Sequence, residues 1–234
     1  MRLLVSVCDG DEAAAALAGG ADIIDAKDPA AGPLGAVAID MLRQIGAAAG
    51  ADRLVTAAIG DAAAEGAVAG AAFASATAGA RLVKVGFAGI GDMPRAAALL
   101  RAAVRGASAG CDRCGVVAVA YADADQVASL HPDLLIDAAA AAGASGVLLD
   151  TADKSGPGLR GRMTQPALTA WVTRARQRGL MVALAGRLQL DDLDFVREAG
   201  ADIAGVRGAA CDGGRAGRIS VEKVRALRRL CYQP

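Results

Sequence analysis

Lysine is rare in this chain, and its positions point to chemistry. Of the 25 basic residues only four are lysine, namely Lys27, Lys84, Lys154 and Lys223. Arginine supplies charge but stays protonated, whereas a lysine amine can be tuned to act as a neutral nucleophile. Each of these four positions is therefore a candidate for a role that arginine could not fill.

The elements that must position these amines follow from a repeat of about thirty residues. Alanine-rich segments with helix-like apolar spacing, such as 93–107 and 165–179, separate short apolar segments that mostly begin near a glycine. These apolar segments have strand-like lengths and lie at 2–7, 19–27, 50–59, 79–87, 114–121, 143–151, 178–186 and 200–208. The alternation predicts eight strands, most of them followed by a helix.

Eight such units predict a single-domain (β/α)8 TIM barrel over residues 1–234. An open, doubly wound α/β sheet shows the same alternation and is the alternative. We favour the barrel because the units are nearly regular. In addition, no Gly-x-Gly-x-x-Gly turn follows the first segment, as it would in a dinucleotide-binding sheet.

Strand parity turns several charged side chains towards the barrel interior. Side chains alternate between the two faces of a strand, and the wholly apolar faces should meet the helices. Near the C-terminal ends of strands two, four and six, the inward residues are then Asp25, Lys27, Lys84 and Asp150. Active sites of TIM barrels lie at this end. We therefore expect these side chains to converge on one catalytic centre.

Each lysine could instead be a solvated surface charge. That interpretation fits Lys223, which lies in the terminal helical segment "SVEKVRALRRL". It fits Lys27 and Lys84 poorly, because an inward amine is costly to bury unless it is paired or neutral. Lys154 follows Asp150 by four residues in a loop, and on this reasoning alone either interpretation holds for it.

The chemistry that fits these residues is imine formation. A lysine in a poorly hydrated barrel mouth, beside a second cation, can lose its proton near neutral pH and attack a carbonyl. We expect Asp25 and Asp150 to pair with the amines. Asp150 and the second amine could then move protons during the reaction.

The loops after strands seven and eight predict a phosphate site. They read "AGRLQLDD" and "VRGAACDGGRAGRIS", and the second is rich in glycine and arginine and precedes a helix. TIM barrels often bind phosphate at these loops, where backbone N–H groups can hold an anion. Arg215 could add charge, and the residues that we expect at the phosphate are Gly186, Arg187, Arg207, Gly208, Ala209 and Ala210.

Composition limits the partners and the location. The formal net charge is zero and no basic run stands out, which argues against nucleic acid and anionic membranes as partners. No uninterrupted apolar stretch is long enough for a transmembrane helix, and the first residues predict a strand and not a signal peptide. We expect a cytoplasmic protein that acts on a small molecule.

A metal site is not expected. The cysteines are odd in number, and only Cys111 and Cys114 lie close together in the sequence. A zinc site would need two further ligands, yet the remaining cysteines are isolated and His131 is the only histidine. A structural or incidental role for this pair is the simpler interpretation.

With these residues placed, the chain resembles the (5-formylfuran-3-yl)methyl phosphate synthases of methanofuran biosynthesis. The resemblance spans essentially the whole chain. It is carried by "LLVSV", "GGADIIDAKDPAAGPLGA", "KVGF", "YADA", "LLDTADKSG", "ALAGRL" and "GVRGAACDGGRAGRI". One departure is Asp28, where other members often have asparagine, and it places a further carboxylate beside Lys27.

The resemblance implies residue roles and a reaction. It makes Lys27 the Schiff-base residue and Lys84 the proton acceptor, and it assigns catalytic roles to Asp150 and Lys154. The implied reaction condenses two molecules of glyceraldehyde 3-phosphate into a phosphorylated furan aldehyde, with loss of phosphate and water. No cofactor and no metal are implied.

Two other functions remain open from the sequence. One is a class I (Schiff-base) aldolase that acts on another sugar phosphate, and the other is a non-catalytic phosphosugar-binding barrel. Inward lysines argue against the binder, because arginine would serve it as well. Whether the chain forms a homo-oligomer also stays open.

Overall fold

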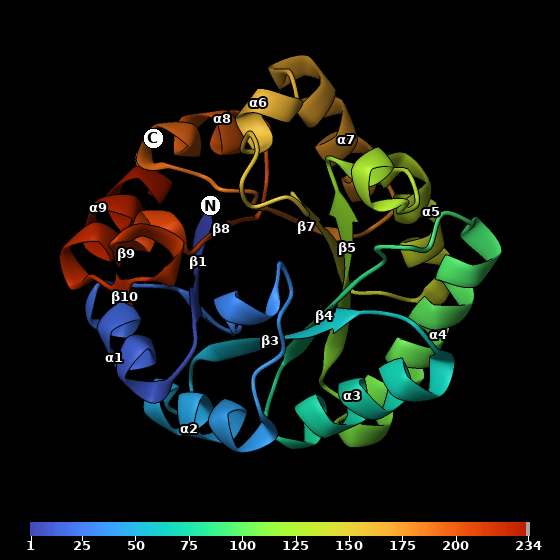
Figure 1. Cartoon of the computed structure of the whole chain (residues 1–234), viewed down its shortest axis with the longest axis horizontal. Coiled ribbons are helices and arrows are strands. Elements are labelled where there is room, and N and C mark those ends of the chain that lie inside the picture. Colours follow the sequence, from blue (N-terminus) through green and yellow to red (C-terminus); the bar gives the residue numbers. More distant parts are fainter. Residues whose placement is uncertain (233–234) are drawn as a thin grey trace.

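The structure, a computed structural model, describes residues 1–232 as a closed barrel of parallel strands with helices around it (Figure 1). The strands are β1 (Arg2–Val7), β2 (Ile23–Ala26), β3 (Leu54–Asp61), β4 (Leu82–Gly86), β5 (Gly115–Tyr121), β6 (Gly146–Asp150), β7 (Met181–Leu184) and β8 (Ile203–Val206). Neighbours in sequence are neighbours in the barrel, and β1 pairs with β8 to close it. The TIM-barrel prediction is confirmed. Residues 233 and 234 of the predicted domain lie outside the described residues.

Helices cover the outer face of this barrel (Figure 1). They are α1 (Gly10–Ala18), α2 (Ile39–Ala49), α3 (Glu65–Thr77), α4 (Met93–Gly110), α5 (Pro132–Ala142), α6 (Leu159–Arg162), α7 (Gln165–Gln177), α8 (Leu193–Glu198) and α9 (Val221–Cys231). Several begin with a side chain that caps a free backbone N–H group, as Asp92 does for α4. No helix within residues 1–232 is long and apolar enough to cross a membrane.

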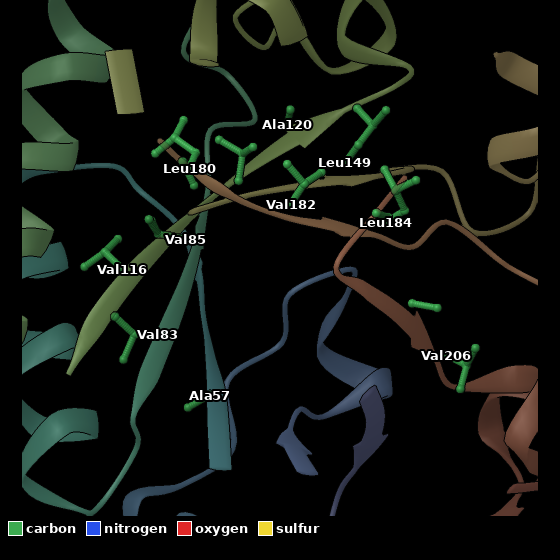
Figure 2. Packing of buried hydrophobic residues seen from close by; sticks show 14 of the residues in the cluster. Ala57, Val83, Val85, Val116, Ala120, Leu149, Leu180, Val182, Leu184 and Val206 are labelled. Atoms are coloured by element: carbon green, nitrogen blue, oxygen red, sulfur yellow. The ribbon is translucent and has the colours of Figure 1, made fainter. Parts of the chain in front are cut away.

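The strands carry two separate apolar layers because their side chains alternate between faces. The larger layer packs against the helices, and Figure 2 shows part of it, including Val83 and Val85 of β4. A smaller cluster fills the interior, with Leu4 of β1, Val117 of β5 and Ile203 of β8 among its members. The predicted inward and outward faces of the strands are therefore confirmed. On β2, β4 and β6 the polar side chains of the inward faces lie nearer the C-terminal ends of the strands than the apolar residues of this interior cluster.

Loops at the C-terminal ends of the strands close over this interior. The loop after β2 contains the short helix η1 (Pro29–Ala31), and its Leu34 packs into the interior cluster. The loop after β8 contains η4 (Gly208–Ala210), the short strands β9 (Cys211–Asp212) and β10 (Arg218–Ile219), and η5 (Gly214–Ala216) between them. These loops decide which part of the barrel mouth stays open.

Candidate active site

A cavity of about 260 Å³ lies at the C-terminal mouth of the barrel, which is room for small metabolites and not for a macromolecule. Its floor is apolar and includes Leu4, Val117 and Ile203. Most residues that the sequence analysis singled out are brought together on its wall, namely Lys27, Lys84, Asp150, Lys154, Gly186, Arg187, Arg207 and Gly208. Asp25 lies beneath the wall without exposed surface, and Ala209 and Ala210 are not among the lining residues.

Asp25 at the end of β2 binds Lys84 of β4 and not its sequence neighbour Lys27. Lys84 Nζ lies 2.6 Å from Asp25 Oδ2. Two hydroxyl groups also donate to this carboxylate, Ser6 Oγ at 2.7 Å and Thr56 Oγ1 at 2.6 Å. The register places these residues side by side, since Asp25 is paired with Ser6 on β1 and with Thr56 on β3. The Lys84 amine is therefore fixed in a buried ion pair.

Asp150 at the end of β6 holds the second ion pair. Its Oδ1 accepts from Lys154 Nζ at 2.6 Å and from the backbone N–H of Thr151 at 2.7 Å. Burial raises the pKa of Asp150, but the charges of Lys154 and Lys27 more than offset this, so that its pKa lies below the usual value. Within residues 1–232 no protein donor binds Oδ2, which leaves this oxygen free to handle a proton.

Lys27 is the amine without an ion-pair partner among the described residues. It follows β2 directly, is 7% exposed, and has no carboxylate oxygen of residues 1–232 within 4.0 Å of its Nζ. Burial and the charge of Lys84 lower its pKa from 10.5 to about 7, although Asp150 and Asp25 oppose this shift. A large fraction of this amine is therefore neutral near physiological pH.

Asp28, the departure from the family pattern, does not bind Lys27. Its Oδ1 accepts a hydrogen bond from the backbone N–H of Ala30 at 2.8 Å and so caps η1. The added carboxylate thus shapes the turn after Lys27 and does not pair with the amine.

The loop after β7 presents unbonded backbone N–H groups. Gly186 has a φ of 103°, a backbone conformation that is strained for residues with a side chain, and a Cβ atom there would lie in tight contact, 3.1 Å from Thr151 Cγ2. Arg187 adopts the left-handed region at a φ of 56°, which is unusual for a residue with a side chain. Within residues 1–232 the N–H groups of Gly186, Arg187 and Leu188 have no protein acceptor. They can therefore receive an anion.

Arg207 at the end of β8 has contacts that differ from those expected of a phosphate ligand. Its guanidinium forms a buried ion pair with Glu12 of α1. The remaining N–H groups donate to backbone carbonyls of Ser6 at 3.1 Å, Arg215 at 3.2 Å and Gly217 at 2.9 Å. All five donors of the side chain are thus used. Arg207 braces the loop after β8, while the N–H groups of Gly208 and Ala209 are free of protein acceptors within residues 1–232.

Two positioning residues were missed by the sequence analysis. Glu12 resembles an ordinary acidic residue in the first turn of a helix, and only the need of an inward Arg207 for a partner could have revealed it. Asp123 was quoted within "YADA" but given no role. Its two carboxylate oxygens accept from the backbone N–H groups of Ala152 at 2.7 Å and Asp153 at 2.9 Å, and they thereby hold the loop that carries Lys154.

Groups that could ligate a metal do not cluster in the described part of the chain. Within residues 1–232 no three histidine, cysteine, aspartate or glutamate side chains are arranged to hold an ion. Cys114 is buried and Cys111 is partly exposed, and both are free thiols. The functional groups that the pocket offers are amines, guanidinium groups, carboxylates, hydroxyl groups and backbone N–H groups.

Solved structures with a similar fold include enzymes that are named for phosphorylated compounds. The superposition with phosphoribosyl anthranilate isomerase from Thermus thermophilus has a TM-score of 0.65 at 18% identity and covers 98% of each chain. With 3-hexulose-6-phosphate synthase the TM-score is 0.64 at 22% identity, covering 97% of this chain and 99% of the other. At these identities the likeness shows the barrel fold alone.

Sequence relatives are closer and share the whole chain. A protein of Methanocaldococcus jannaschii named (5-formylfuran-3-yl)methyl phosphate synthase is 40% identical over 234 residues, which cover 99% of this chain and 100% of the relative. A protein of the same name from Methanopyrus kandleri is 41% identical over 94% of this chain and 93% of its own length. The sequence model of the 4-HFC-P synthase family matches residues 3–228, a range that contains the barrel strands except Arg2 of β1 and every lysine of the pocket. The chain therefore belongs to the 4-HFC-P synthase family.

Proposed function

We propose that this chain condenses two molecules of glyceraldehyde 3-phosphate into (5-formylfuran-3-yl)methyl phosphate through an imine at Lys27. The observation that carries the proposal is the state of this amine. Lys27 is buried in the pocket, has no ion-pair partner within residues 1–232, and has a pKa of about 7. The names of full-length relatives support the product.

The imine explains why a lysine is needed. The neutral Lys27 amine attacks the carbonyl carbon of a triose phosphate, and the resulting carbinolamine loses water to form a C=N bond. Once protonated, the imine withdraws electrons from the adjacent carbon, which can then release a proton and become a carbon nucleophile. Attack of this carbon on the carbonyl of the second triose phosphate forms the carbon–carbon bond.

The later steps need groups that donate and accept protons. Lys84 is near enough to Lys27 for its charge to lower the pKa of that amine. We assign two steps to it: the ammonium gives its proton to the hydroxyl that leaves the carbinolamine as water, and the resulting neutral amine takes the proton from the carbon beside the imine. Asp150 Oδ1 accepts a hydrogen bond from Lys154, and Oδ2 has no protein donor within residues 1–232. The Asp150–Lys154 pair therefore suits the proton transfers during elimination of water and phosphate. Asp25 fixes Lys84 and does not itself line the cavity.

The phosphate group of a substrate would bind at the loops after β7 and β8. Backbone N–H groups of Gly186, Arg187, Leu188, Gly208 and Ala209 have no protein acceptor within residues 1–232. Four of these groups belong to residues that line the cavity: Gly186, Arg187 and Leu188 follow β7, and Gly208 follows the adjacent strand β8. Converging N–H groups are a common device for binding phosphate.

The experiment is to mix the protein with glyceraldehyde 3-phosphate and to measure released phosphate together with the furan aldehyde. We expect both products to form at equal rates. A simple aldolase or a phosphosugar-binding barrel would release no phosphate. Lys27→Arg should lose activity by several orders of magnitude, and Lys223→Arg is its control because Lys223 binds the carbonyl of Cys211 outside the cavity.

The product would feed the synthesis of methanofuran, a carrier of one-carbon units, as the family resemblance implies. A cytoplasmic location belongs to this proposal. The oligomeric state does not enter it, since every residue invoked comes from one chain.

A further inference from the structure

The wall of the pocket carries more cations than the described carboxylates can pair. Its basic lining residues are Lys27, Lys84, Lys154, Arg187, Arg207 and Arg215. Three of them form ion pairs within residues 1–232, namely Lys84 with Asp25, Lys154 with Asp150, and Arg207 with Glu12. Burial lowers the pKa of Lys27 to about 7, so that this amine is largely uncharged above that pH. Arg187 and Arg215 remain charged and have no carboxylate of the described residues within 4.0 Å.

Arg215 leans from the loop after β8 towards the loop after β2. Its Nη2 donates to the carbonyls of Gly32 at 2.7 Å and Pro29 at 3.2 Å. Within residues 1–232 its Nε and Nη1 have no protein acceptor, so three of its five N–H donors are unused. The side chain is half-buried, and burial lowers its pKa. A guanidinium at the cavity wall with unused donors is a suitable partner for an anion.

Arg187 leans in the opposite direction around the barrel. It belongs to the loop after β7, and its Nη1 binds the carbonyls of Ser155 and Gly156 in the loop after β6. The strand order places β6 and β7 on one side of β8, and β1 and β2 on the other. The two arginines therefore reach towards loops on opposite sides of β8, at different sectors of the pocket mouth.

We infer that the pocket binds two phosphate groups at once, one at Gly186–Leu188 beside Arg187 and the other at Arg215. The inference rests on the proposed function and deepens it, because two phosphorylated trioses bring two phosphate groups into one cavity. Arg215 supplies Nε and Nη1 to the second group, a pairing that Arg is well suited to make with phosphate oxygens. The ligand class at Arg215 is thus a phosphate monoester or the phosphate released from it.

The first test counts phosphate sites without any turnover. Inorganic phosphate is titrated into the protein at low ionic strength in a calorimeter. The variants are Arg215→Gln, which removes the charge and the guanidinium donors but keeps a polar side chain, and Arg218→Gln. Arg218 is the matched control because it lies in the same loop, is exposed, and pairs with Asp9 away from the cavity.

We expect two sites per chain in the wild type and in Arg218→Gln, and one site in Arg215→Gln. A single site in the wild type overturns the inference. So does an Arg215→Gln protein that keeps both sites or loses both.

A second measurement separates this inference from the proposed reaction. Arg215→Gln should raise the apparent KM for glyceraldehyde 3-phosphate by about tenfold or more, as loss of a charge-assisted hydrogen bond implies. An unchanged KM contradicts the Arg215 site. If no imine forms at Lys27, the proposed reaction fails, while the count of phosphate sites still decides the inference.

Discussion

Lys27 differs from the other pocket lysines in what surrounds its amine. Lys84 and Lys154 each lie 2.6 Å from a carboxylate oxygen, and Lys27 has only more distant charges of both signs around it. Burial without a partner favours the neutral form of an amine. Lys27 is therefore the residue whose protonation state can change within the range of pH where an enzyme works.

The first prediction is that Lys27→Met stabilises the fold near neutral pH. The pKa of Lys27 is about 7 when folded and near 10.5 when unfolded, so the unfolded chain binds more protons between these values. Stability is therefore lost as the pH falls from 10.5 towards 7, and methionine avoids this loss. We expect a gain of about 4 kcal/mol near pH 7 that vanishes above about pH 10.5.

Urea unfolding of the wild type and of Lys27→Met, followed at several pH values, measures this gain. The same difference in unfolding free energy at every pH would show that the amine is not destabilised by its burial.

The second prediction concerns Lys84 and the pH at which Lys27 reacts. The charge of Lys84 lowers the pKa of Lys27, and Asp25 opposes this shift. Lys84→Ala removes the cation and frees the carboxylate, and both changes raise the pKa of Lys27. Borohydride trapping of the imine should then reach half its maximum about one pH unit or more higher than in the wild type. An unchanged midpoint together with unchanged turnover would make Lys84 a structural cation.

At the scale of elements, the reactive groups are placed by strand ends and by side chains that hold the following loops. The Asp123 carboxylate fixes the loop after β6 by accepting hydrogen bonds from the backbone N–H groups of Ala152 and Asp153. Its Oδ2 also lies 3.5 Å from Arg162 Nη2. Glu12 of α1 fixes Arg207, and Arg207 in turn holds the loop after β8. Neither carboxylate lines the pocket, so both act through other residues.

The third prediction is that Asp123→Asn slows turnover without affecting imine formation. Asparagine keeps one acceptor but loses the other and the charge, so the loop that carries Lys154 is held less firmly. We expect kcat to fall about tenfold, with little change in KM and in trapping at Lys27. Asp125→Asn is the matched control, because Asp125 is exposed two residues further along. A parallel fall in trapping would show that Asp123 supports the whole pocket and not this loop.

The fourth prediction is that Glu12→Gln destabilises the chain and loosens the loop after β8. The substitution leaves the buried Arg207 guanidinium without a counter-charge, which costs about 3 kcal/mol in comparable buried pairs. Hydrogen exchange should become faster in residues 208–220, whereas Asp11→Asn, on the exposed side of α1, should change neither property. Unaltered exchange in Glu12→Gln would mean that Arg207 does not hold this loop.

At the scale of the whole molecule, the barrel brings together residues from distant parts of the chain. The sequence predicted the eight strands and the inward face of β2, β4 and β6, because alternation of apolar and polar residues reports which face is buried. It predicted that Asp25 and Asp150 pair with amines, but not which amine each one binds, and it did not predict the partner of Arg207. Asp25 binds Lys84, 59 residues away, and Arg207 binds Glu12, 195 residues away. Such choices depend on register and side-chain reach, which local patterns do not encode.

The phosphate loops show the same limit. Glycine content predicts an anion site after β7 and β8, where the N–H groups of Gly186 and Gly208 have no protein acceptor within residues 1–232. The pattern did not separate Arg207, whose donors are all used, from Arg215, whose donors are not. Only the folded chain shows which guanidinium at the cavity keeps N–H donors that are not used within the described residues.

The central claim is tested most directly by reducing the protein with borohydride in the presence of glyceraldehyde 3-phosphate. Cleavage after arginine places the four lysines on separate peptides, 3–43, 82–95, 114–160 and 219–225. We predict a mass increase of one reduced triose phosphate on peptide 3–43 alone, with a yield that rises as the pH passes through about 7. Label on peptide 82–95 or 114–160, or no label on peptide 3–43, would contradict an imine at Lys27.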